Sequence, residues 1–154
     1  MITLDGQITK NFSLREMIHS DTAAKLKIQN VPNLKHTDNL TALCEKVLQP
    51  LRDKLGVSIK VSSGFRCDEL NKLVGGAPTS QHRFGEAADI SAAGMTTQEL
   101  FDFILASGIE YDQVIQEFGQ WVHISYRRTG KNRNVAMFAT WRKSGTAKYT
   151  RLKK

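Results

Sequence analysis

Two histidines and one aspartate, in two short segments, are the residues of this chain best suited to chemistry. His82 and Asp89 are seven positions apart, and Gly85 between them allows the backbone to turn back. His123 stands in the apolar, β-prone segment 121–126, which predicts a strand. Two imidazoles and one carboxylate make a three-ligand zinc site with a coordination position left for water. That arrangement is typical of hydrolytic rather than structural zinc.

The segments around these residues carry the signatures of a known family. Segment 80–89 fits S-x-H-x-x-G-x-A-x-D, Trp121 precedes His123 by two positions, and segment 63–66 reads Ser-Gly-Phe-Arg. From about Phe12 to Tyr126 the chain resembles the zinc D-Ala-D-Ala carboxypeptidase-like murein peptidases. This family includes phage endolysin peptidases and shares its fold with the hedgehog signalling domain. The resemblance implies Zn²⁺ as cofactor and peptidoglycan stem peptides as substrate, with His82, Asp89 and His123 as the zinc ligands.

The expected catalytic base is Glu117. One branch of the family places an acidic residue three positions before the last histidine, where this chain has Gln120, which cannot accept and return a proton. Another branch, including hedgehog-like domains, places a glutamate six positions before it, where Glu117 stands. Glu117 shares a sheet face with His123 only if the intervening turn is three residues long or bulged, so that Glu117 opposes His123. The alternative is a strand residue that faces solvent.

Three further residues are candidates for the site. Arg66 lies sixteen positions before His82, similar to the arginine that polarises the scissile carbonyl in some family members, and a guanidinium can hold an oxyanion with two donors. Its alternative role is a surface ion pair. Ser80 is predicted to bind substrate or to orient its loop, with turn capping as the alternative. Trp121 is predicted to line the cleft, with a place in the core as the alternative.

Composition and charge indicate one globular domain, residues 1–154, with a net charge of +7. Ten of the lysines and arginines fall in segment 127–154, and no acidic residue follows Glu117. This segment either favours an anionic partner such as the cell wall or is a solvated, partly flexible terminus. Nucleic acid is an unlikely partner, because no recognised binding motif is present and aromatic residues are few in the segment. The oligomeric state stays open.

Neither a signal peptide nor a transmembrane segment is recognisable. We therefore expect synthesis in the cytoplasm and action on the cell wall after release. Cys44 and Cys67 lack the spacing of metal ligands and are expected to be free structural thiols.

The pattern of elements predicts an α+β fold: an antiparallel sheet with helices packed mainly on one side, as in hedgehog-like domains and DD-peptidases. The clearest helix covers residues 40–51, with Thr37 or Asp38 as N-cap and Pro50 disturbing its last turn. Capping boxes begin further helices at Ser13 and Thr96, and segment 68–74 predicts another. The expected strands are 57–61, 87–92, 112–118, 121–126 and, more weakly, 134–140.

The sequence therefore predicts a zinc peptidase that hydrolyses peptidoglycan stem peptides, as a D-Ala-D-Ala carboxypeptidase or as a murein endopeptidase, in phage or prophage cell-wall lysis. The alternative is a zinc-containing, non-catalytic module of the same fold that recognises cell-wall peptide. The two differ in whether Glu117 faces the metal ligands.

Overall fold

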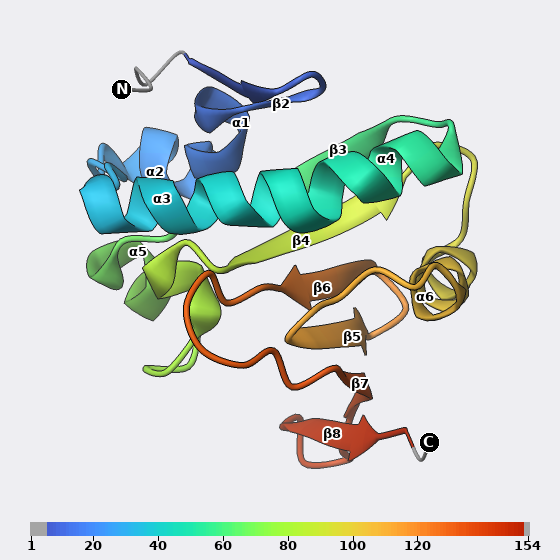
Figure 1. Ribbon diagram of the computed structural model, residues 1–154. Coiled ribbons are helices and arrows are strands. Elements are labelled where there is room, and N and C mark those ends of the chain that lie inside the picture. Colours follow the sequence, from blue (N-terminus) through green and yellow to red (C-terminus); the bar gives the residue numbers. More distant parts are fainter. Residues whose placement is uncertain (1–5, 153–154) are drawn as a thin grey trace.

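The computed structural model describes residues 6–152 and shows an α+β fold built on a six-stranded sheet, in the order β3-β4-β6-β5-β7-β8 (Figure 1). Its strands are β3 (Ile59–Ser63), β4 (Ala87–Ala92), β5 (Gln113–Glu117), β6 (Trp121–Ser125), β7 (Val135–Trp141) and β8 (Ala147–Arg151). A separate two-stranded hairpin joins β1 (Gln7–Thr9) to β2 (Phe12–Ser13).

The predicted α+β class is confirmed, but the sheet is mixed rather than purely antiparallel. All its pairs are antiparallel except β5 and β7, which run parallel. The reason lies in the path of the chain after β6. Because β6 ends beside the start of β5, the connection 126–134 passes round that end of the sheet, and β7 begins beside Gln113.

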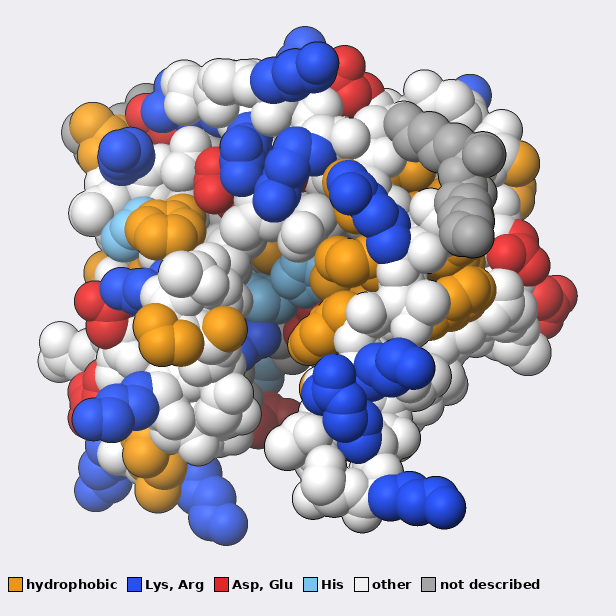
Figure 2. Space-filling view, turned by 90° about the horizontal axis from the view of Figure 1, so that it is seen from below, with side chains coloured by type: hydrophobic (Ala, Val, Ile, Leu, Met, Phe, Trp, Pro, Cys, Tyr) orange, Lys and Arg blue, Asp and Glu red, His pale blue; other side chains and the backbone are white. Residues whose placement is uncertain are grey.

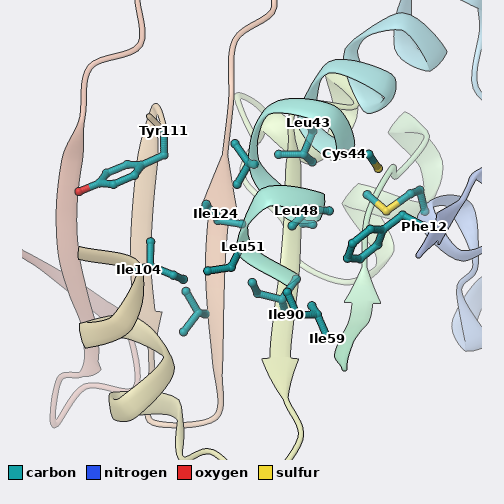
Figure 3. Packing of buried hydrophobic residues seen from close by; sticks show 14 of the residues in the cluster. Phe12, Leu43, Cys44, Leu48, Leu51, Ile59, Ile90, Ile104, Tyr111 and Ile124 are labelled. Atoms are coloured by element: carbon teal, nitrogen blue, oxygen red, sulfur yellow. The ribbon is translucent and has the colours of Figure 1, made fainter. Parts of the chain in front are cut away.

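Helices cover one face of the sheet, as predicted. The helical elements are α1 (Leu14–Ile18), α2 (Asp21–Leu26), α3 (Leu34–Leu43), η1 (Cys44–Leu48), α4 (Gln49–Leu55), α5 (Asp68–Leu73), η2 (Gln81–Phe84) and α6 (Thr97–Ala106). The α3, η1 and α4 segments form one long helix across the sheet (Figure 1). Its apolar residues and those of α6 pack against even-numbered strand residues such as Ile90 and Ile124 (Figure 3).

The long helix begins earlier than its apolar pattern indicates. Neither Thr37 nor Asp38 is its N-cap: the N-cap is Asn33, whose side chain accepts a hydrogen bond from the His36 backbone N–H at 2.9 Å. His36 returns the interaction, since its Nδ1 accepts from the Asn33 backbone N–H at 3.2 Å. This histidine version of a capping box satisfies two groups at the helix start.

Pro50 does not end the helix, which continues to Leu55 and is capped by Gly56 at φ 70°. The irregularity lies just before the proline. There η1 is a π-helical turn, and the Gln49 N–H bonds the Cys44 carbonyl. A wider turn directly before a proline accommodates a ring that has no N–H and crowds the preceding turn.

The strand register separates the core from the opposite face. In β4 and β6, Asp89 pairs with His123, and Ala88 pairs with Ile124. Because side chains alternate between the faces of a sheet, Ala88 and Ile124 enter the core while Asp89 and His123 project from the face that the long helix leaves uncovered. Across residues 6–152, no helix combines the length and the apolarity that crossing a membrane requires.

Candidate metal centre

His82, Asp89 and His123 converge on the uncovered face of the sheet. Each offers one donor atom, and these atoms all lie within 4.8 Å of one another. Asp89 Oδ1 lies 3.2 Å from His82 Nε2 and 3.1 Å from His123 Nδ1. Asp89 and His123 come from the paired strands β4 and β6, and His82 comes from η2, which precedes β4. All three residues are buried.

The His82 ring is oriented by a second contact. Its Nδ1 donates a hydrogen bond to the Gly64 carbonyl at 2.6 Å, which fixes the neutral tautomer and leaves the Nε2 lone pair facing Asp89 and His123. Gly64 can hold this place because it has no side chain: a Cβ there would lie 2.1 Å from the Met17 carbonyl oxygen. The Ser-Gly-Phe-Arg segment thus supports the metal centre through a backbone carbonyl.

Electrostatics keep Asp89 ionised and His82 neutral, which are the forms that metal binding requires, and act differently on His123. Burial alone would raise the pKa of the Asp89 carboxyl, but the two neighbouring imidazoles hold that pKa well below its ordinary value. Burial lowers the pKa of His82, which favours the neutral ring. Burial also acts to lower the pKa of His123, but hydrogen bonding and charge from Asp89 raise it above the ordinary value. The raised pKa favours a proton on the His123 ring. A divalent cation bound among these donors would take the place of that proton.

Glu117 lies on the same sheet face as His123. The turn between β5 and β6 has three residues, 118–120, one of the two turn types predicted to put Glu117 on that face, and Phe118 and Gly119 take left-handed conformations at φ 56° and 69°. The register differs from the predicted one by two residues, since Glu117 pairs with Trp121 rather than with His123, and Ile115 pairs with His123. Glu117 Oε1 still reaches to 3.6 Å from His123 Nδ1, because both residues project to the same side.

The environment of Glu117 is suited to proton transfer. Burial raises the pKa of its carboxyl above the ordinary value, and the charge of His123 opposes the change only in part. A carboxyl group whose pKa moves towards neutrality can both accept and return a proton. Its place beside the candidate ligands agrees with the predicted role as base, which itself stays a prediction.

Arg66 is fixed beside the same three ligands. Its Nε donates to Ser63 Oγ at 3.2 Å, its Nη1 donates to Asn71 Oδ1 at 3.1 Å, and its Nη2 lies 3.8 Å from Asp89 Oδ2. The alternative of a surface ion pair does not hold, because the side chain is only 14% exposed and its acidic neighbour is Asp89. Asp68, an acidic residue two positions after Arg66, pairs with Arg83 instead.

These groups lie in a cleft of about 660 Å³. Figure 2 shows the molecule from this side: histidine side chains lie in the central hollow, with lysine and arginine side chains gathered around it. Ser80 and Trp121 both line the cleft. Ser80 Oγ also accepts a hydrogen bond from the His82 backbone N–H at 3.3 Å, so it caps η2 as well. Substrate contacts by Ser80 and Trp121 stay predictions.

Part of the cleft wall was not predicted from the sequence. Arg127, Arg133, Met137 and Tyr149 line it from the segment after β6. The excess of lysine and arginine in segment 127–154 was noted, but nothing in its spacing assigned individual residues to the site. That segment contributes β7 and β8 to the main sheet.

The donor set fits zinc. Imidazole nitrogen and carboxylate oxygen are normal ligands for this ion, and three protein ligands beside a cleft leave room for a reacting molecule. The fold and the site together are typical of hydrolytic metal centres rather than structural ones.

Comparison with known families agrees with this class. The family described as Peptidase M15 matches residues 10–125, and the chain belongs to this family. The family is zinc-dependent, and the matched residues include the whole His-Asp-His set. No curated protein matches the chain.

Proposed function

We propose that this chain is a zinc-dependent peptidase that hydrolyses peptide bonds in peptidoglycan stem peptides. The observation that carries the proposal is the meeting of His82, Asp89 and His123, with Glu117 beside them, at a cleft of about 660 Å³. Membership of the peptidase M15 family supports it.

His82, Asp89 and His123 would hold the metal ion. When bound, such an ion acidifies a water molecule and polarises a carbonyl group. Glu117 takes the proton from the attacking water and returns it to the leaving amine. Arg66, held by Ser63 and Asn71, donates to the oxygen on which negative charge develops. Since the chain already fixes its guanidinium, little reorganisation is needed as that charge forms.

Membership of the family supports peptidase action in general. Which peptide bond is cleaved is part of the proposal: the enzyme either releases a terminal D-Ala or cleaves within the stem or the cross-link. We place the activity in phage or prophage cell-wall lysis, with synthesis in the cytoplasm and action on the wall after release. The basic segment 127–154 suits a polymer that carries carboxylates.

A non-catalytic binding module of the same fold is the competing function. It requires no proton acceptor at the metal and would be favoured by Glu117 on the far face of the sheet. The register of β5 and β6 instead puts Glu117 on the ligand face, 3.6 Å from His123. This geometry favours the peptidase.

Incubation of the purified protein with defined muropeptides, with and without a chelator, tests the proposal. We expect zinc-dependent cleavage, and mass analysis of the products identifies the bond. Glu117→Gln should retain zinc and lose turnover, whereas His123→Ala should lose both. Full activity of Glu117→Gln would refute the assignment of the base, and the absence of cleavage by the zinc-loaded protein would favour the binding module.

A further inference from the structure

Part of the cleft wall lies outside the residues that match the family. The match ends at residue 125, whereas Arg127, Arg133, Met137 and Tyr149 line the cleft from beyond that point. Two of these four side chains are guanidiniums. This wall is therefore a place where the chain can recognise a chemical group that the family signature does not define.

A buried carboxylate holds both guanidiniums in place. Asp112 has no exposed surface, and its two oxygens accept from Arg133 Nε at 3.0 Å and Arg133 Nη2 at 2.7 Å. Asp112 Oδ2 also lies 3.4 Å from Arg127 Nε. The Arg133 backbone N–H donates to Asp112 Oδ1 at 2.9 Å. Asp112 thus occupies one edge of the Arg133 guanidinium and fixes its direction, and it attracts the Nε side of Arg127 as an ion-pair partner.

The other edges of the two guanidiniums remain accessible. The Arg127 side chain is 37% exposed and the Arg133 side chain 45% exposed. Each guanidinium has five N–H donors in a fixed fork, and the contacts with Asp112 engage only those on one side. The accessible donors suit a planar anion, and a carboxylate is the anion that such a fork binds with two hydrogen bonds.

The charge of the cleft lining agrees with an anionic ligand. Three arginines line the cleft, Arg66 among them, against the carboxylates Asp89 and Glu117. The remaining acidic neighbours, Asp112 and the half-buried Glu86, are not part of the lining. A divalent metal ion at the ligand set adds further positive charge.

The arginine pair is linked to the metal centre through one residue. Gln81, which directly precedes the ligand His82, donates from Nε2 to Asp112 Oδ2 at 3.1 Å. Gln81 and His82 both line the cleft. A group bound by Arg127 and Arg133 would therefore lie near the scissile bond, not at a remote surface.

We propose that Arg127 and Arg133 form a carboxylate-binding subsite that selects peptides with a free carboxylate next to the cleaved bond over the corresponding carboxamides. The proposal rests on the proposed peptidase function. It assigns to the segment after residue 125 the choice of substrate, while residues of the matched segment carry out hydrolysis.

Paired substrates test this subsite. Two stem peptides that differ only in a carboxylate or a carboxamide beside the scissile bond are compared by kcat/KM with the zinc-loaded protein. We expect the wild type to prefer the acid by about tenfold or more, as for hydrogen bonds between charged groups. Arg127→Gln should remove most of that preference, because it removes one of the two guanidiniums that bind the carboxylate. Lys143→Gln, an exposed residue of the β7–β8 turn that does not line the cleft, is the charge-matched control and should keep the preference.

A second variant separates recognition from folding. Arg133→Lys keeps a positive charge beside buried Asp112 but loses the fork, so the preference should fall while the variant still folds and zinc content stays at the wild-type level. Calorimetry with zinc-loaded Glu117→Gln protein should show tighter binding of the acid than of the carboxamide. Equal cleavage of both peptides by the wild type, or an unchanged preference in Arg127→Gln, would overturn the subsite. Cleavage of neither peptide would instead count against the proposed function.

Discussion

Gly76 offers a sharp test of how Arg66 is positioned, because its substitution disturbs Arg66 without touching a metal ligand. An alanine Cβ at this position would lie 2.0 Å from Asn71 Oδ1 and 2.8 Å from Arg66 Nη1. The φ angle of Gly76 is not in the left-handed region, so alanine can adopt the backbone conformation and the effect is steric. Asn71 must move, and it is the side chain that accepts from Arg66 Nη1 at 3.1 Å.

The structure sets the size of the expected effect. Moving Asn71 breaks its contact with Arg66 and also its Nδ2 hydrogen bond to the Ala77 carbonyl at 2.9 Å. A hydrogen bond to a charged group contributes about 1.5–3 kcal/mol. A misplacement of about 1 Å at a catalytic site costs about a hundredfold in rate. We therefore expect Gly76→Ala to lower kcat/KM by about ten- to a hundredfold.

The assay is turnover of a stem peptide together with zinc content, and zinc content should remain at wild-type level. In an Asn71→Ala background the closest contact is gone and only the contact with Arg66 Nη1 at 2.8 Å remains, so Gly76→Ala should add less than it costs in the wild type, and the two effects should be non-additive. Gly94→Ala is the control: it carries the strain of a left-handed φ of 72° but meets nothing within 4 Å. Unchanged turnover in Gly76→Ala, or additive effects in the double variant, would show that Asn71 does not position Arg66 for catalysis.

Two further predictions concern stability and the metal loop. Asp112→Asn should destabilise the fold by about 2 kcal/mol. This is less than the about 3–5 kcal/mol lost when a fully buried ion pair is broken, because both arginines are partly exposed. Burial alone would raise the pKa of Asp112, but Arg133 lowers it below its ordinary value. The stabilisation is therefore complete above the unfolded pKa of about 3.9 and is lost as pH falls through the folded value. Urea unfolding should show a gap between the two proteins at pH 7 that closes below about pH 4, and a gap independent of pH would contradict this account. Gly85→Ala should weaken zinc binding in a competition titration, because Gly85 has φ 74° and a Cβ would lie 2.5 Å from the His36 carbonyl oxygen. Unaltered zinc affinity would show that the loop between His82 and Asp89 does not need this turn.

The predictable part of the fold is the part set by local patterns. Ser13 and Thr96 accept hydrogen bonds from backbone N–H groups three residues later, as their capping boxes predict. β4 has the predicted bounds Ala87–Ala92, and Gly85 ends the preceding 3₁₀ turn two positions before it. The N-cap of the long helix was missed because His36, rather than glutamate or glutamine, closes its box with Asn33.

Long-range pairing was less predictable. The parallel position of β7 beside β5 depends on the path of connection 126–134, which no local pattern specifies. β8 was missed because its outer residues are polar and exposed, as an edge strand allows. β1, β2 and α2 are too short to give a periodic signal.

In the candidate site, too, local motifs were predictable and long-range contacts were not. The sequence motifs were sufficient to predict that His82, Asp89, His123 and Arg66 lie together, as they do in the structure. The sheet face on which Glu117 lies could be predicted only on the condition of a three-residue or bulged turn. The strand residue paired with His123 is Ile115, and not Glu117 as predicted. Arg127 and Arg133 could not be assigned, because only the folded chain brings buried Asp112 behind them.

X-ray absorption at the zinc edge of the loaded protein reports directly on whether His82, Asp89 and His123 form a hydrolytic zinc centre. We expect one zinc per chain, coordinated by two imidazole nitrogens at about 2.0–2.1 Å, a carboxylate oxygen and at least one further light atom. An added ligand should replace that further atom. His82→Ala and His123→Ala should each remove one imidazole or abolish binding. A sulfur ligand from Cys44 or Cys67, or a shell filled entirely by protein groups, would contradict a hydrolytic centre at His82, Asp89 and His123.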